Sequence, residues 1–308
     1  MTSMPAHIYI ARCGIVLSFL LTLAMFNGAS ADEAKPQPYD WAPESGKLLA
    51  TAGVSQIEGA GGGGLVPWAL ITGYGTRDAV GGNAHYTFVR TSSFDLHSAG
   101  AAVGLYDRVE VSFARQWLDT RLVGAKVGLG KNFMIDQNIA GLKVRLFGDA
   151  VYDQDRWWPQ VSVGMQYKAN NRGALLSAIG ARSSDGADFY VAATKLLLAN
   201  NLLVNATVRA TRANQFGLLG FGSDRNPGYS PQFEGSVVYL INRNLAVGGE
   251  FRTKPDNLSF AREDNAWDLF GAWFISKNVS ATAGYANLGR IVGQTSQGGL
   301  YFSLQVGF

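Results

Sequence analysis

The feature that most constrains this chain is an alternation of apolar and polar residues with a period of two. In PQVSVGMQYK, which ends at Lys168, the apolar side chains of Val161, Val163, Met165 and Tyr167 alternate with polar residues or glycine. NLLVNATVRAT, residues 201–211, and NLAVGGEFR, residues 244–252, repeat the pattern. Successive residues of a strand point to opposite faces. The pattern therefore predicts many strands, each with one apolar and one polar face.

The last nine residues favour one all-β fold over another. A soluble sandwich also alternates, because its two apolar faces meet in a core. In LYFSLQVGF, however, the apolar face runs to a final aromatic residue. Such a final strand is typical of the signal by which bacterial outer-membrane barrels are recognised by the barrel-assembly machinery. The predicted assembly signal comprises four residues of this face: Phe302, Leu304, Val306 and Phe308.

The amino terminus predicts export. Arg12 precedes an apolar run, residues 14–26, and the small residues Ala29-Ser30-Ala31 follow it. This is the plan of a secretory signal peptide, and the run is too short to span a bilayer. We predict that residues 1–31 are a cleaved signal peptide, that 32–47 are a periplasmic N-terminal segment, and that 48–308 form an outer-membrane β-barrel.

We therefore predict an all-β fold, a transmembrane antiparallel up-and-down β-barrel of about 14 strands (roughly 12 to 16), with both termini periplasmic. Three of the predicted strands are weak: 48–57, 83–91 and 123–134. The short periplasmic turns are expected near 107–108, 170–172, 200–201, 243 and 277–278. The longer outer loops are expected at 150–158, 213–231, 254–264 and 290–297.

Charged residues within the strands should share the polar face, because a lipid-facing Arg or Lys at the bilayer midplane costs about 2–4 kcal/mol. Arg115 and Lys195 are exceptions near strand ends, where a long side chain can reach the headgroups. Six tryptophans suit the interfacial girdles of such a barrel: Trp68, Trp117, Trp157, Trp158, Trp267 and Trp273. The predicted lumen charges comprise nine residues: Glu110, Lys143, Arg145, Asp149, Lys168, Asp188, Arg209, Glu250 and Arg252.

The stretch EGAGGGGL, residues 58–65, has glycines at 59, 61 and 64, the spacing of a dinucleotide fingerprint. That fingerprint must open a helix after a strand, and the following Val66-Pro67-Trp68 cannot do so. Two interpretations remain. The run is either a flexible outer connection between the first two strands, or a segment that folds into the barrel mouth where backbones approach closely.

The chain also resembles an uncharacterised outer-membrane protein family of Gram-negative bacteria, domain of unknown function 3034. The resemblance covers about residues 48–308. It rests on VSQIEGAGGGGLVPWALI, VGLYDRVE, LFGDAVYDQD, TRANQFGLLGFG, RTKPDNLSFARED and SLQVGF. It implies an outer-membrane location and no catalytic or binding residue.

Little in the sequence points to catalysis. After the leader only His85 and His97 offer imidazoles, and Cys13, the single cysteine, leaves with the leader. His97 adjoins Ser98, but neighbours on a strand point to opposite faces, so the two are badly placed for nucleophilic attack. A formal net charge of +3, spread along the chain, gives no reason to expect a nucleic acid. We expect no enzyme activity, no cofactor, no metal and no nucleic-acid partner.

Two functional hypotheses remain. The first is a porin-like passive channel for a small solute that the sequence does not identify, because inward charges of both signs could face each other across a constriction. The second is a closed barrel with a structural or partner-binding role, in which the same charges pair and fill the lumen. An uptake route for apolar molecules is a variant of the first, with QFGLLGFG and LVPWALI lining its entrance. The expected partners are outer-membrane lipids and the assembly machinery.

Overall fold

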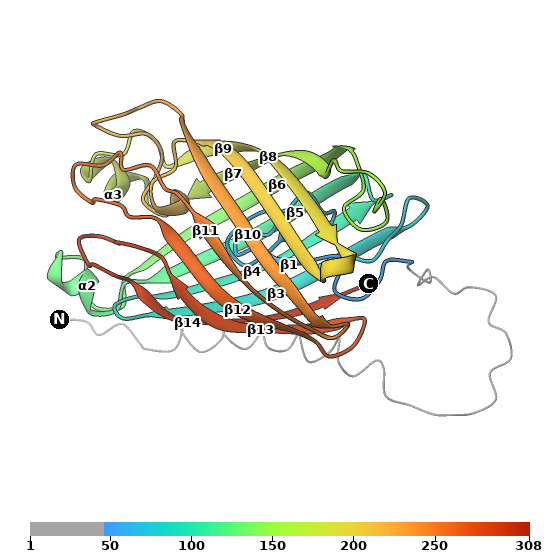
Figure 1. The fold of residues 1–308 in the computed structure, drawn as a ribbon. Helices are drawn as coiled ribbons and strands as arrows, with labels where there is room; N and C mark the ends of the chain where they lie inside the picture. Colours follow the sequence, from blue (N-terminus) through green and yellow to red (C-terminus); the bar gives the residue numbers. More distant parts are fainter. Residues whose placement is uncertain (1–45) are drawn as a thin grey trace, which may run out of the picture. The chain divides into compact units, whose positions relative to one another are not determined.

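The computed structural model describes residues 46–308, and the predicted signal peptide lies outside the described residues. Twelve strands, β3 to β14, form a closed barrel (Figure 1). Their bounds are β3 Val80–Thr91, β4 Asp95–Leu105, β5 Val109–Asp119, β6 Met134–Phe147, β7 Gln160–Asn170, β8 Asp185–Leu197, β9 Leu202–Thr211, β10 Ser230–Asn242, β11 Leu245–Arg252, β12 Ala266–Phe274, β13 Val279–Asn287 and β14 Gly298–Gly307.

The barrel is antiparallel throughout and follows the chain from strand to neighbouring strand. It closes where β14 pairs with β3, from Gly299 opposite Thr91 to Gly307 opposite Asn83. Closure leaves no unpaired strand edge. No helix in the described part of the chain is long and apolar enough to cross a membrane.

The two ends of the barrel differ. At one end, which we call the turn end, lie the connections 106–108, 148–159, 198–201, 243–244 and 275–278, together with Phe308 and the first described residues. The opposite end, the loop end, carries 92–94, 120–133, 171–184, 212–229, 253–265 and 288–297. The loop end includes the short helices α2 (Arg121–Lys126) and α3 (Gly173–Ala178).

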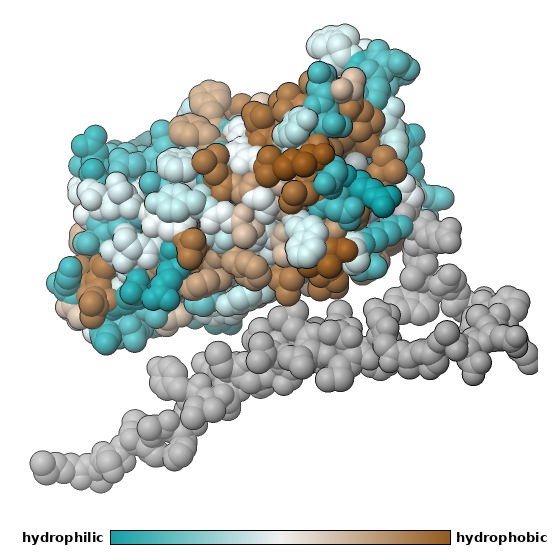
Figure 2. Space-filling view, turned by 60° about the horizontal axis from the view of Figure 1, so that its bottom comes forward, coloured by the Kyte–Doolittle hydropathy of each residue, from teal (hydrophilic) through white to brown (hydrophobic). Residues whose placement is uncertain are grey.

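The alternation in the sequence matches the two faces of the wall. In β7, Met165 and Tyr167 are exposed, whereas Gln166 and Lys168 are buried inside. Figure 2 shows apolar residues spread across one outer face and hydrophilic residues gathered towards its ends. Arg115 pairs with Asp136 on the outside near the loop end, and Lys195 donates to carbonyls of the 148–159 connection. Both basic exceptions therefore lie near strand ends.

The strand number is at the lower limit of the predicted range. Of the three weak strands, 83–91 is part of β3, 123–134 is mostly α2 and its following turn, and 48–57 is not in the wall. Two predicted connections lie at the opposite end of the barrel from the one expected. The expected short turn at 170–172 is at the loop end, where the connection to β8 includes α3, and the expected outer loop at 150–158 is at the turn end. Short segments rich in alanine and glycine carry too few residues for periodicity to separate strand from helix.

Residues 46–79 precede the wall instead of forming part of it, and we call them the plug because their central part lies inside the barrel. The strands β1 (Val54–Ser55) and β2 (Gly61–Gly62) pair as a small hairpin within it. Every residue from Val54 to Gly75 is buried. Trp68 is buried in the lumen, so its predicted place in a girdle is wrong.

The glycine run lies in the plug, so its interpretation as an outer connection is wrong. The interpretation as a segment of close backbone approach is correct in kind, although the run lies in the lumen and not at the mouth. A Cβ added at Gly62 would lie 2.4 Å from the oxygen of Val66, and one at Gly63 would overlap the carboxylate of Glu250. The contacts at Gly62 are with backbone, so only glycine fits there, whereas a side chain at Gly63 would displace the carboxylate of Glu250 from its hydrogen bonds to the plug.

Candidate functional site: the plugged lumen

Glu110 and Lys143 bind the backbone of the plug as a pair. The two carboxylate oxygens of Glu110 each accept a backbone N–H at 2.9 Å, one from Gly61 and one from Thr72. The Nζ of Lys143 donates to the oxygens of Gly61 and Leu70, both at 2.8 Å, and pairs with Glu110 at 3.0 Å. Both side chains are 1% exposed. The pair therefore satisfies plug backbone groups that have no strand partner.

Glu250, on β11, binds the next part of the plug. Its carboxylate accepts the backbone N–H of Leu65 at 2.6 Å and that of Val66 at 3.3 Å. Its other oxygen accepts the hydroxyl of Ser236 at 2.7 Å, and the indole of Trp68 donates to the same hydroxyl at 2.9 Å. The plug is thus anchored to this side of the wall by backbone and by an aromatic side chain.

Neutral side chains complete the attachment. The oxygen of Ala69 accepts from Gln160 and Ser162, both at 2.6 Å, and its N–H donates to Thr194 at 2.7 Å. On the opposite side Gln305, on β14, accepts the N–H of Ser55 at 3.1 Å. Polar contacts from many strands therefore hold the plug, and the lumen has no single binding face.

Five acidic and basic side chains of the wall surround the plug residue Glu58. Glu58 pairs with Arg252 at 2.8 Å, with Lys168, and with Arg209 at 3.9 Å. Together with Glu58 they form what we call the lumen ion cluster, which has six members: Glu58, Lys168, Asp188, Arg209, Glu234 and Arg252. Its three acids balance its three bases, and every member is nearly inaccessible. Breaking such a buried pair by removing one partner costs about 3–5 kcal/mol.

A second segment enters from the loop end and covers the cluster. This cap loop, residues 212–223, includes the 3-10 turn η3 (Gln215–Gly217). The centroid of the Phe216 ring lies 4.4 Å from the guanidinium carbon of Arg252. The backbone oxygen of Phe216 accepts a hydrogen bond from the Nζ of Lys168 at 3.2 Å. Asn170 donates to the oxygen of Leu218 at 3.0 Å. The ion cluster therefore lies between the plug and the cap loop.

Two ionisable residues of the 253–265 connection hold the cap loop. Lys254 donates to the side-chain oxygen of Gln215 at 2.8 Å, and Glu263 accepts the N–H of Gln215 at 2.7 Å. The two charges lie 3.6 Å apart. Burial lowers the pKa of Lys254 and raises the pKa of Glu263, and their mutual attraction opposes both shifts.

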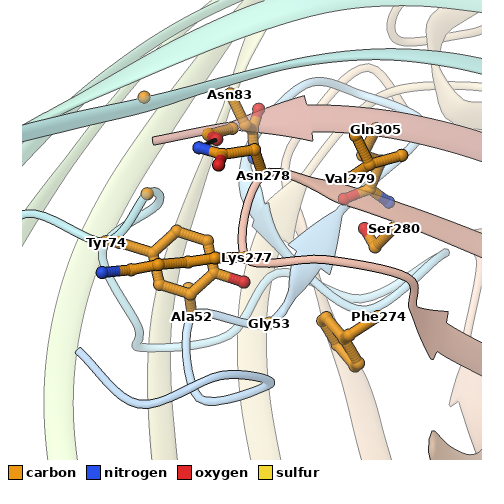
Figure 3. Close-up of a pocket in the computed structure, with 13 residues that line it drawn as sticks. Ala52, Gly53, Tyr74, Asn83, Phe274, Lys277, Asn278, Val279, Ser280 and Gln305 are labelled. Atoms are coloured by element: carbon orange, nitrogen blue, oxygen red, sulfur yellow. Dashed lines mark hydrogen bonds between the residues drawn. The ribbon is translucent and has the colours of Figure 1, made fainter. Parts of the chain in front are cut away.

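The turn end is closed as well. A cavity of about 30 Å³ lies there between the plug and β12 to β14, room for only one or two waters. Figure 3 shows Ala52, Gly53 and Tyr74 of the plug beside Phe274, Ser280 and Gln305 of the wall. Nearby, an outer ion group joins Lys47 to Asp107 at 2.8 Å and Arg145 to Asp149 at 3.0 Å.

One buried carboxylate beside the plug has no partner. Asp268 is opposite Glu250 in the β11–β12 pair and is 2% exposed, yet neither of its side-chain oxygens is hydrogen-bonded. The hydroxyl of Tyr301 is also buried without a partner. A Cβ added at Gly64 would lie 3.1 Å from both groups, so they face the plug.

Residues 51–305 match the family described as protein of unknown function (DUF3034). The chain belongs to this family. No curated protein matches the sequence.

Solved structures similar to this DUF3034 protein include outer-membrane barrels. A KdgM porin is 10% identical, with a TM-score of 0.49, over 73% of this chain and 99% of that one. The COG4313 outer membrane channel from Pseudomonas putida F1 is 13% identical, with a TM-score of 0.44, over 79% and 96%. Outer membrane phospholipase A from Escherichia coli is 12% identical, with a TM-score of 0.42, over 73% and 92%.

The structure distributes the nine predicted lumen charges over three places. Lys168, Asp188, Arg209 and Arg252 meet in the ion cluster. Glu110, Lys143 and Glu250 contact the plug backbone. Arg145 and Asp149 are at the turn end, and Asp149 is in a connection instead of a strand.

Sequence reasoning missed three acids of the lumen. Glu234 and Asp268 alternate with the outward residues Phe233, Trp267 and Leu269, so the period of two could have found them. Glu58 follows no strand pattern because it belongs to the plug. The four residues of the assembly signal are in β14 and after it, with Phe302, Leu304 and Phe308 exposed on the outside.

His85 and Ser98 approach each other inside the barrel, 3.4 Å apart between Nε2 and Oγ. The Ser98 hydroxyl donates to the oxygen of the plug residue Ile57 at 2.6 Å, and both residues are buried. His97 is on the other face of the strand, where its Nδ1 is hydrogen-bonded to the hydroxyl of Tyr86 at 2.7 Å. Within residues 46–308, no three His, Cys, Asp or Glu side chains gather as metal ligands would.

Proposed function

We propose that this chain forms a porin-like channel of the bacterial outer membrane that the plug closes, and that it conducts a small solute when the plug moves. The observation that carries the proposal is that a segment preceding the first wall strand fills the lumen. Among the described residues the plug continues into the wall only at Val80. It can therefore leave without breaking any strand pair of the barrel.

The outer surface supports a membrane location. Phe113, Leu269 and Leu300 point outwards and are 53%, 60% and 70% exposed, as expected for side chains that contact lipid. Short turns and the termini of such barrels face the periplasm, and the longer loops face outwards. We place the turn end in the periplasm, with export by the predicted signal peptide and assembly through the carboxy-terminal strand.

The lumen would be polar once the plug had left. Small barrels are filled by their own side chains, whereas this barrel of twelve strands needs a separate segment to fill it. The vacated wall would present Glu110, Lys143, Glu250 and the charged residues of the ion cluster, all hydrated by entering water. Charges of both signs around a pore are a common basis of selectivity.

A permanently closed barrel is the second candidate, because the ion cluster buries Glu58 among three cations. In that case the plug is part of the folded core, and the protein has a structural or partner-binding role. The two candidates predict different results when the cluster is disrupted. A closed channel should open, while a filled barrel should only lose stability.

Planar-bilayer recordings of the full chain separate the candidates. We expect the wild type to be closed most of the time and Arg252→Glu to conduct, because the new carboxylate would repel Glu58. Arg209→Glu should conduct less often, since Arg209 lies farther from Glu58, 3.9 Å against 2.8 Å. A folded Arg252→Glu protein that stays silent would favour the permanently closed barrel.

We propose no catalytic role. The closest approach to a nucleophile and base, Ser98 with His85, has its hydroxyl engaged by the plug. Outer-membrane lipids and the assembly machinery are the proposed partners, with no cofactor and no nucleic acid.

A further inference from the structure

The loop end contains a cavity of about 120 Å³ that is separate from the plugged lumen. All six connections of the loop end contribute to its lining. The lining includes at least one side chain from each connection, among them Phe94, Val123, Ile179, Leu219, Phe260 and Val292. All six connections therefore converge on one shared cavity at the loop end.

The cavity is apolar throughout. Thr120 has the only polar side chain in its lining, and its hydroxyl donates to the oxygen of Phe133 at 2.8 Å. No charged side chain takes part. A sugar or an ion would lose its water hydrogen bonds here without replacement, at a cost of about 1–3 kcal/mol for each unmatched group.

The cavity also reaches the surface. Val127 and Phe260 line it and are themselves 44% and 49% exposed, so apolar side chains form its rim. The buried faces of the two helices form its walls, with Val123 from α2 and Leu176 from α3. External loops of a barrel meet water, and this inward clustering of apolar residues leaves a void that their packing does not fill.

The volume indicates the size of the ligand. An engineered cavity of about 150 Å³ lined by Leu, Ile and Phe stays dry and binds benzene. The cavity here is slightly smaller and has the same kind of lining. We propose that it is a binding site for small apolar molecules, of the size of a single aromatic ring or a short branched alkyl group. This site does not depend on whether the plug opens.

The site lies against the cap loop. Leu219 lines the cavity, and Phe216 of the same loop lies over Arg252 of the ion cluster. Of the two segments expected at an apolar entrance, QFGLLGFG contributes through Leu219, whereas LVPWALI lies in the plug. A ligand in the cavity would therefore contact the segment that covers the lumen from outside.

Bromobenzene is a suitable probe, measured by saturation-transfer NMR on the full chain in detergent. Ile179→Trp should fill the cavity and reduce specific transfer roughly tenfold or more. Ile241→Trp is the matched control, because Ile241 is outside the barrel near the turn end and 49% exposed. Subtracting the Ile179→Trp signal removes the contribution of probe dissolved in the micelle.

Crystals soaked in bromobenzene locate the probe independently, through the anomalous signal of bromine. We expect a peak between α2 and α3 that Ile179→Trp abolishes and Ile241→Trp keeps. Heat-modifiable gel migration verifies that each variant is folded, and Leu175→Phe replaces Ile179→Trp if that variant fails to fold. Equal transfer in wild type and both variants, or bromine only on the lipid-facing surface, would overturn the proposal. Neither readout involves conductance, so the result is distinct from that for the channel.

Discussion

Replacing Glu58 by glutamine tests how the plug is held. The substitution keeps the shape and the hydrogen-bonding oxygen of the side chain but removes its charge. Three cations of the ion cluster, Lys168, Arg209 and Arg252, would then face only two acids, Asp188 and Glu234. One buried positive charge would be left uncompensated when the plug is in place, and water could solvate it only when the plug moves.

The magnitude can be derived from the burial of the pair. Removing one partner of a buried ion pair costs about 3–5 kcal/mol. Each 1.36 kcal/mol changes an equilibrium about tenfold, so the ratio of open to closed plug should rise by roughly two to nearly four powers of ten. A wild type that opens rarely would become a variant that conducts for a measurable fraction of the recording.

Planar-bilayer recording measures this fraction, and Asp188→Asn is the matched control. Asp188 belongs to the same cluster and is equally buried, but its partners Lys168, Arg209 and Thr211 are all on the wall. Asp188→Asn leaves the same excess of one cation, but it keeps the ion pairs between Glu58 and the wall, so the plug should open far less often than in Glu58→Gln. If folded Glu58→Gln opens no more often than the wild type, or if Asp188→Asn opens as much, the reasoning is wrong.

Other predictions concern the barrel and its assembly. Asp268→Asn should raise the free energy of unfolding by about 1–3 kcal/mol, because it neutralises a buried carboxylate without a partner; chemical denaturation in detergent measures this, and a decrease would count against it. Leu269→Lys should lower the free energy of unfolding by about 2–4 kcal/mol, since the side chain faces lipid, and an unchanged denaturation midpoint would argue against that environment. Removing Phe308 should reduce the amount of protein in the outer membrane more than a substitution at Gln305, and equal amounts on immunoblots would contradict its role in assembly. Mass spectrometry of the outer-membrane form should find an amino terminus at Asp32, whereas a form beginning at Met1 would refute cleavage after Ala31.

The wall could be predicted from the sequence because a half-buried strand has a local signature. Phe113, Met165 and Leu269 point outwards, and each has a polar neighbour that points inwards, namely Ser112, Gln166 and Asp268. Once one residue of a strand is assigned to a face, the period of two assigns its neighbours, and no information from the rest of the chain is needed. The short helices α2 and α3 were missed because six residues are too few to establish a helical period.

The plug could not be predicted from the sequence, for a different reason. Its backbone is paired with side chains of the wall, such as Glu110 and Glu250, that are far away in the sequence. A segment whose backbone is bonded to side chains instead of to a neighbouring strand does not need alternating apolar and polar residues, so its sequence carries no strand pattern. The glycines at 62 and 63 were the one local signal, because they indicate close approach without identifying what approaches.

A reversible disulfide between plug and wall tests the central claim most directly. The plug residue Ala69 belongs to a small buried cluster with Tyr190 and Ala192 of β8. The sequence has no cysteine after Cys13, so Ala69→Cys with Ala192→Cys would introduce the only two cysteines beyond residue 13. Introduced together with Glu58→Gln, this pair should give a barrel that is silent when oxidised and conducts after a reductant is added. Equal conductance before and after reduction, with the disulfide verified by mass spectrometry, would contradict a channel closed by residues 46–79.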